Sequence, residues 1–60
     1  KQGTLIRSYT NNLSIYENVG REQPYTIWAY NEVLRFEGSL KDAIQWCLSR
    51  NGKEEYSLGE

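Results

Sequence analysis

Few residues of this 60-residue chain have side chains that could do chemistry. It contains no His, a single Cys (Cys47), a single Asp (Asp42) and seven Glu scattered along the sequence. A tetrahedral zinc site needs several Cys or His ligands, and a calcium loop needs carboxylates at close alternating positions. Gly38 stands alone, so there is no glycine-rich turn to cradle a phosphate. The sequence therefore predicts a protein that is not an enzyme and holds no metal and no cofactor.

Cys47 falls on the apolar stripe of a predicted helix, which indicates a small buried thiol rather than a nucleophile. One Cys cannot form an internal disulfide, and the chain has no secretory segment and no apolar run approaching 18 residues. Seven Lys and Arg against eight Asp and Glu give a net charge of −1, too small to attract polyanions or membranes. These features predict a cytoplasmic, intracellular protein without membrane association.

The remaining chemical signal is a set of aromatic and arginine side chains. Trp, Tyr and Arg dominate the binding hot spots of protein interfaces, so an exposed cluster of them indicates a partner. Strand alternation gathers most of the set on the sheet face away from the helix. Trp46, on the helix, is expected to be largely exposed and can stack on Arg50. The predicted partner-binding residues are Arg7, Tyr9, Tyr16, Trp28, Tyr30, Arg35 and Trp46.

Residues 25–31 form the predicted strand at the centre of this face. Ile27 and Ala29 alternate with Trp28 and Tyr30, and a period of two among β-branched and aromatic residues is typical of a half-buried strand. Ile27 and Ala29 are therefore assigned to the core. Trp28 and Tyr30 are left on the open side.

A turn at Asn31 and Glu32 leads into the next predicted strand, residues 33–37. The alternation resumes there and places Leu34 and Phe36 in the core. Arg35 is thereby assigned to the open side with the aromatic residues.

A change of period from two to 3.6 marks the start of a helix after this strand. Ser39 is a typical N-cap with Asp42 three residues later, and the helix is expected over about 40–51. Gly52 is expected to take the left-handed position that ends it. The apolar stripe consists of Leu40, Ala43, Ile44, Cys47 and Leu48.

Two more strands are predicted in the first third of the chain, over 4–10 and 13–19, joined by a turn at Asn11 and Asn12. The following segment, VGREQP, is a loop. An alternative interpretation makes residues 4–10 an extension beside a three-stranded sheet.

The side-chain directions of these two strands follow from alternation. Ile6 is preferred over its neighbour Leu5 as the core residue of the first strand, which turns Arg7 and Tyr9 outward. The core residues of the second strand are Leu13 and Ile15.

These patterns predict one small α+β domain spanning residues 1–60. Its core covers about 4–52, and 53–60 form a polar, mobile tail. An alternative interpretation docks Tyr56 and Leu58 on a partner or on the domain itself. The fold is a small antiparallel sheet of three or four strands, in the order ββββα, packed on one face by a single C-terminal helix.

The composition of the open face favours a small protein-binding module of adaptor or inhibitor type. Its aromatic and arginine residues are typical of interface cores, and protein binding requires no net positive charge. Such small domains recur among phage-encoded and mobile-element inhibitors of host enzymes. Two structural interpretations are cross-strand pairs that stiffen the sheet, and packing against a larger protein or a second copy.

Nucleic acid is an alternative partner for the same face. The order of three strands and a helix over residues 13–48 resembles the DNA-binding domains of the plant AP2 type and the arm-binding domains of tyrosine recombinases. The segment FEGSLKDA is similar to the strand-to-helix step of AP2 domains. The resemblance implies DNA binding through the sheet, but only Arg7 and Arg35 stand where those families carry many basic residues.

A third hypothesis is a homodimer or homo-oligomer formed by strand addition at an exposed edge. Which strands are edges depends on the sheet order. A meander would leave the first and fourth strands open, and Leu5 and Ile6 would make the first a sticky edge.

Overall fold

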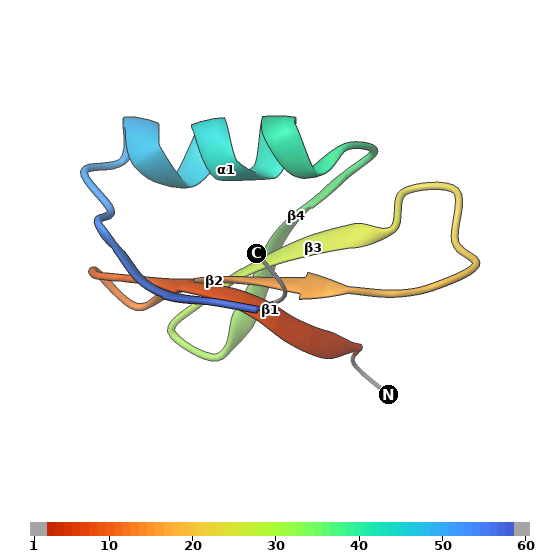
Figure 1. Cartoon of the computed structure of the whole chain (residues 1–60), viewed down its shortest axis with the longest axis horizontal. Coiled ribbons are helices and arrows are strands. Elements are labelled where there is room, and N and C mark those ends of the chain that lie inside the picture. The colour runs from red at the N-terminus through yellow and green to blue at the C-terminus, as the bar shows by residue number, and fades with distance from the viewer. Residues whose placement is uncertain (1–2, 59–60) are drawn as a thin grey trace.

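The computed structural model describes residues 3–58 (Figure 1). The alternating segments between residues 4 and 37 and the helical segment after Ser39 form separate layers. An antiparallel sheet lies below one helix, so the fold is α+β as predicted. The described chain has five strands rather than three or four, and its order is ββββαβ. The elements are β1 (Thr4–Tyr9), β2 (Leu13–Glu17), β3 (Tyr25–Ala29), β4 (Glu32–Glu37), α1 (Leu40–Ser49) and β5 (Glu54–Ser57).

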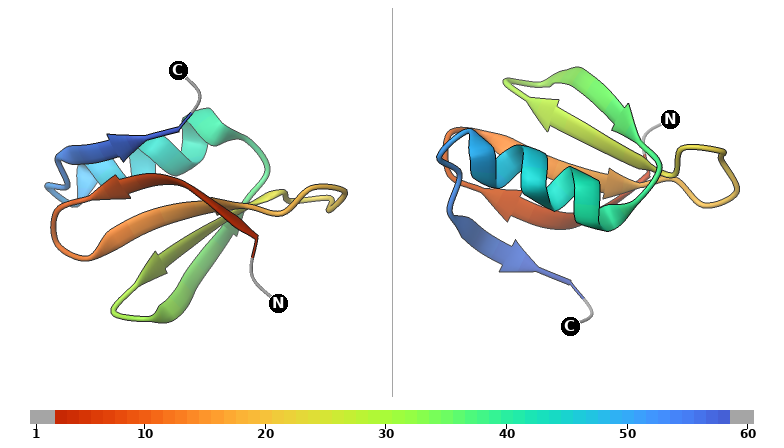
Figure 2. Two further views of the ribbon diagram at one scale, coloured as in Figure 1. Left: turned by 60° about the horizontal axis from the view of Figure 1, so that its bottom comes forward. Right: turned by 90° about the horizontal axis from the view of Figure 1, so that it is seen from above.

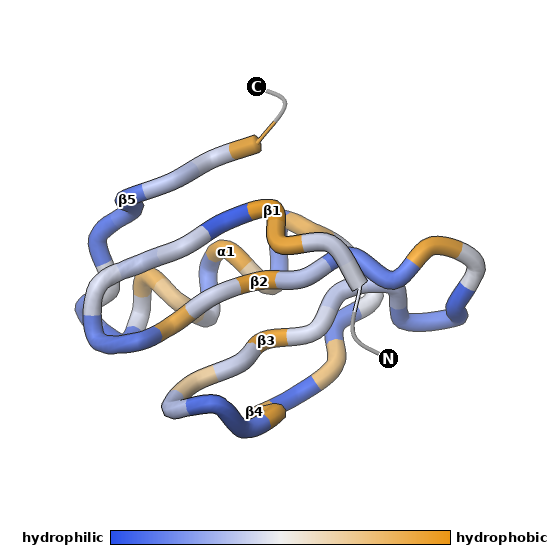
Figure 3. Tube along the Cα trace, turned by 90° about the horizontal axis from the view of Figure 1, so that it is seen from below, coloured by the Kyte–Doolittle hydropathy of each residue, from blue (hydrophilic) through white to orange (hydrophobic). Residues whose placement is uncertain are grey.

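The helix lies over the middle of the sheet, and the edge strands extend beyond it on both sides (Figure 2). The strand order is β4-β3-β2-β1-β5, so the first four strands form a meander and the last strand returns beside the first. Figure 3 shows the sheet from the side away from the helix, with β4 and β5 at opposite edges. Of the two edges expected for a meander, β4 is an edge, but β1 is not, since β1 pairs with β2 and with β5.

The strand β5 corrects the prediction of a polar, mobile tail over residues 53–60. Its backbone continues the sheet, because Thr10 donates to the Lys53 carbonyl at 3.0 Å and Leu58 donates to the Ile6 carbonyl at 2.9 Å. The segment EEYS has too little apolar alternation to predict a strand. It pairs with β1 through backbone hydrogen bonds, which its side-chain pattern does not reveal. Residues 59 and 60 of the predicted tail lie outside the described residues.

The core lies between the helix and the central strands. Ile15, Ile27 and Cys47 are fully buried. Leu40 and Ile44 pack against this cluster from the helix. The predicted core positions in β2 and β3 are thus confirmed, as is Ile6 in β1. The buried apolar residues are Ile6, Tyr9, Leu13, Ile15, Ile27, Ala29, Ala43 and Cys47.

The helix begins as predicted but ends earlier. Ser39 is its N-cap, and the Ser39 hydroxyl accepts the Asp42 N–H at 3.2 Å. Asn51, at φ 64°, takes the left-handed position that the sequence assigned to Gly52. A Cβ on Gly52 would lie 2.9 Å from the Cys47 carbonyl oxygen, so glycine is needed there for close packing. Leu48, predicted in the apolar stripe, is exposed.

The prediction that Leu34 and Phe36 face the core is wrong. The turn is at Tyr30 and Asn31, one residue earlier than expected, and the pairing with β3 shifts between Ile27 and Trp28. Such a bulge reverses side-chain parity. Leu34 and Phe36 are 43% and 48% exposed.

A second bulge reverses the parity of β1. The pairing with β2 shifts between Leu5 and Arg7, so that Leu5 lies opposite Tyr16 and Arg7 lies opposite the buried Ile15. Arg7 and Tyr9 therefore point to the helix side, although alternation without a bulge placed them on the open side.

These parities predict which truncations destabilise the fold. Ile27→Ala should cost about 2–5 kcal/mol of unfolding free energy, because it removes fully buried methyl groups and leaves a cavity. Leu34→Ala should cost less than about 1 kcal/mol, since its side chain is already half in water. Urea denaturation of both variants measures the difference. Equal losses would contradict the reversed parity of β4.

Candidate functional site

The seven predicted binding residues do not form one face. Their positions follow from cross-strand pairing, in which directly opposite residues point to the same side of the sheet. Tyr16 and Trp28 lie on the face away from the helix, and Tyr30 lies in the turn beside them. The other four lie on the helix side. They are Arg7, Tyr9, Arg35 and Trp46.

Arg7 belongs to the framework. It is only 7% exposed, and its guanidinium lies 3.7 Å from the Glu54 carboxylate and donates a hydrogen bond to the Ser57 hydroxyl. Both partners are in β5. Because a buried charge has to be paired, this cluster fixes the last strand onto β1. Arg7 is therefore unsuited to contact a nucleic-acid phosphate.

Tyr9 lies beside this cluster in the core. Its hydroxyl is buried and has no hydrogen-bond partner among the described residues. Burial raises the pKa of Tyr9 above its ordinary value, with smaller contributions from Cys47 and Glu54. Tyr9 is a core residue whose ring fills space under the helix.

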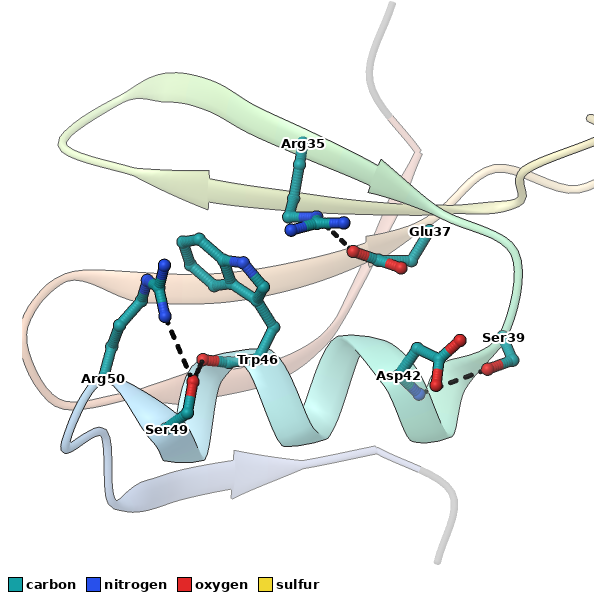
Figure 4. Close-up of polar contacts among 7 residues, drawn as sticks. All are labelled: Arg35, Glu37, Ser39, Asp42, Trp46, Ser49 and Arg50. Carbon is teal, nitrogen blue, oxygen red and sulfur yellow. Dashed lines mark hydrogen bonds and ion pairs between the residues drawn. The ribbon is translucent and has the colours of Figure 1, made fainter.

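Arg35, Trp46 and Arg50 form a stack on the helix side (Figure 4). The Arg50 guanidinium lies 3.8 Å from the centre of the Trp46 ring, and the Arg35 guanidinium lies 5.8 Å from it. Arg35 also forms an ion pair with the largely buried Glu37. Since Arg35 is on β4 and the other two residues end the helix, the stack joins an edge strand to the helix. The predicted stacking of Trp46 on Arg50 is confirmed, but Trp46 is half-buried.

The sheet side opposite the helix, here called the open face, carries the remaining aromatic residues. The Tyr16 and Trp28 rings have centroids 5.9 Å apart and planes tilted by 58°. Register assigns to this face Leu5, Ser8, Ser14, Tyr16, Thr26, Trp28, Val33, Phe36 and Tyr56.

A groove of about 750 Å³ lies at the end of this face where the two hairpins turn. Its aromatic lining is Tyr9, Tyr16, Trp28 and Tyr30, and Leu13 adds an aliphatic side chain. The polar lining comes from the strands and from the two turns, and it includes Ser8, Asn12, Ser14, Asn31 and Glu55. Sequence patterns could not place Asn12, Asn31 or Glu55 there, because their position depends on the turn geometry and on β5.

Tyr30 has an unusual backbone conformation at the rim of this groove. It is 70% exposed and has φ 54°, in the left-handed region where bulky residues are rare. The other hairpin turn has two consecutive asparagines, Asn11 and Asn12, in this region. Asn tolerates positive φ, whereas a tyrosine there is strained, so Tyr30 is held in a costly conformation with its ring mostly in water.

Cys47 does not provide a reactive thiol. It is fully buried, and burial raises its pKa to about 11, a shift that the nearby Arg50 opposes only partly. Among residues 3–58, no three His, Cys, Asp or Glu side chains come close enough together to hold a metal ion. The one described helix is too short and too polar to cross a membrane.

Comparison with protein-family models, with curated protein sequences and with solved structures finds no match to this chain.

Relief of the backbone strain at Tyr30 should be measurable. We expect Tyr30→Asn to raise the unfolding free energy by about 1 kcal/mol, because Asn adopts positive φ at lower cost and little packing is lost. Tyr30→Phe keeps the strain and should stay within about 0.5 kcal/mol of the parent. Urea denaturation of the two variants is the measurement. A destabilised Tyr30→Asn variant would show that the packing of the Tyr30 ring contributes more than its backbone strain costs.

The raised pKa of Cys47 predicts how stability depends on pH. The folded-state pKa of about 11 exceeds the value of 9.0 for an unburied thiol, so the folded state holds this proton more tightly. The contribution of the Cys47 proton to the unfolding free energy is fully present below pH 9 and falls by about 1–3 kcal/mol as the pH rises to 11. Tyr9 adds a smaller loss above pH 10. Denaturation at pH 7.5–11 should show a shallower decline for Cys47→Ala, and equal slopes would contradict the assignment.

Proposed function

We propose that this chain is a small non-catalytic protein-binding module, of adaptor or inhibitor type, that binds its partner through the open face. The observation that carries the proposal is the groove with Tyr16, Trp28 and Tyr30 in its wall. Concave surfaces lined by aromatic residues with a few polar groups are the usual form of binding sites. Tyr and Trp supply large rigid contact areas and are enriched at hot spots.

The strain at Tyr30 supports the same conclusion. A folded chain gains nothing from a strained residue whose ring is mostly in water, and such residues cluster at binding sites. A partner that covers the ring would convert its exposed area into binding free energy. Tyr30 is therefore the proposed contact at the rim, and Trp28 the proposed contact at the centre.

The alternative of nucleic-acid binding through this face is disfavoured, because the two arginines expected there lie elsewhere. Arg7 is buried against β5, and Arg35 lies over Trp46 on the other side of the sheet. None of the residues that register assigns to the open face is Lys or Arg. Without cations on the face, the phosphate contacts that supply most nucleic-acid affinity cannot form there.

Edge pairing is favoured at β4 rather than at β1. β4 is at the sheet edge and exposes Val33, Leu34 and Phe36. Such a strand can add to a second copy of the chain, although its bulge interrupts the row of backbone groups. Self-association through β4 is the second candidate.

The test is capture of a partner from a nuclease-treated lysate of the cells that make the protein. We expect Trp28→Ala to weaken capture by at least about 30-fold, the effect of truncating a hot spot. Tyr30→Asn should weaken it while stabilising the fold, which separates lost binding from lost folding.

Leu48→Ala is the matched control, because it removes an exposed apolar side chain on the helix, away from the open face. It should capture the partner as well as the parent does. A partner retained by the double variant Trp28→Ala and Tyr30→Asn would refute the open face as the site. Sedimentation of the pure chain distinguishes a second copy from a different protein.

A further inference from the structure

We infer that the groove on the open face receives a positively charged side chain, Lys or Arg, from an extended segment of the partner. The inference rests on the proposed function and names the chemistry of its ligand. It is carried by the charges and ring geometry of the groove lining, and by the different surroundings of the two tryptophans.

The charge of the lining has one sign. Among the residues that line the groove, Glu55 is the charged one, and neither Lys nor Arg takes part. Glu55 is exposed and lies at the bulge of β5 against β1, where the pairing shifts between Ser8 and Tyr9. A carboxylate at the rim of an uncharged groove attracts a cation and repels an acidic segment.

The aromatic walls fit the same ligand. Tyr16 and Trp28 are tilted by 58° with centroids 5.9 Å apart, so the two rings form a corner rather than a flat stack. Aromatic ring faces carry negative potential and attract a cation within about 6 Å of the ring centre. Tyr30, from the turn, adds a third ring to the lining. These rings line one groove, and their faces suit an ammonium or guanidinium group.

The two tryptophans provide an internal comparison. Both cation–π contacts found among the described residues are made by Trp46, with Arg35 and with Arg50. Trp28 has an aromatic neighbour, Tyr16, and no arginine from this chain in those contacts. The ring of Trp28 is thus available on the open face for the cation of a partner, whereas Trp46 already stacks on arginines of this chain.

The polar groups along the groove suit a peptide. Ser8 and Ser14 are directly opposite each other on adjacent strands, and Asn12 and Asn31 come from the two turns. Hydroxyl and amide side chains both donate and accept, so they can satisfy the backbone of an extended segment whose basic side chain lies against the aromatic rings.

The experiment is a selection of random dodecapeptides on the full chain, followed by titration of the selected peptides into ¹⁵N-labelled protein. We expect selected peptides to contain Arg or Lys. Replacing that residue by the neutral citrulline or norleucine should weaken binding about fivefold or more. The indole N–H signal of Trp28 should shift, and that of Trp46 should not.

Glu55→Gln should weaken binding about threefold, whereas Glu22→Gln, the same charge change in the exposed 18–24 loop, should leave it unchanged. Neutral or acidic peptides that bind through Trp28 would overturn the cationic ligand and leave the binding module standing. If no peptide binds in a manner that depends on Trp28, the inference fails, whereas the proposed function is decided separately by capture of the partner with the double variant Trp28→Ala and Tyr30→Asn.

Discussion

One short helix has to cover a five-stranded sheet, and the rest of the structure depends on this mismatch. Ten residues of helix are about 15 Å long and, with side chains, about 10 Å wide, whereas five strands at about 4.8 Å spacing span roughly 19 Å. The apolar core is therefore confined to the central strands, around Ile15 and Ile27. Both edges of the sheet, and the whole opposite face, are left without apolar cover.

The edges are held by charged side chains instead of by apolar packing. Arg7 joins β5 to β1 through Glu54 and Ser57, and Arg35 joins β4 to the helix through Trp46. The two arginines expected to bind a partner thus serve the fold. A chain this small has few apolar residues to spare, so it uses the methylene stems and charges of arginine where a larger domain would use a second helix.

The sequence predicts those parts of the fold in which local pattern and backbone geometry agree. Residues 25–29 alternate without interruption and pair in regular register with β2, so the core positions of Ile27 and Ala29 follow from counting. Ser39 is recognised because capping is a local interaction. The wrong side-chain parities in β1 and β4 have one cause. Each bulge adds a residue that counting cannot detect, and everything beyond it, Phe36 in one strand and Arg7 in the other, changes side.

The same limit applies to the candidate site. Tyr16 and Trp28 lie between the two bulges, in regular pairing, and their shared face could be predicted. Asn12 and Asn31 depend on turn geometry, and Glu55 depends on a strand stabilised by its neighbour's backbone rather than by its own pattern.

The bulges also decide the chemistry of the open face. If β1 alternated regularly from the buried Ile6, and β4 from its pairing with Ala29, Arg7 and Arg35 would stand among the aromatic rings, and the face would be basic and suited to an anion. Because both strands change parity, the arginines move to the helix side, where Trp46 and Glu54 receive them. The rings that remain, with Glu55 beside them, form an electron-rich surface without its own cation. Two single-residue irregularities thus convert a face with the composition of a phosphate-binding site into one that favours a positively charged partner.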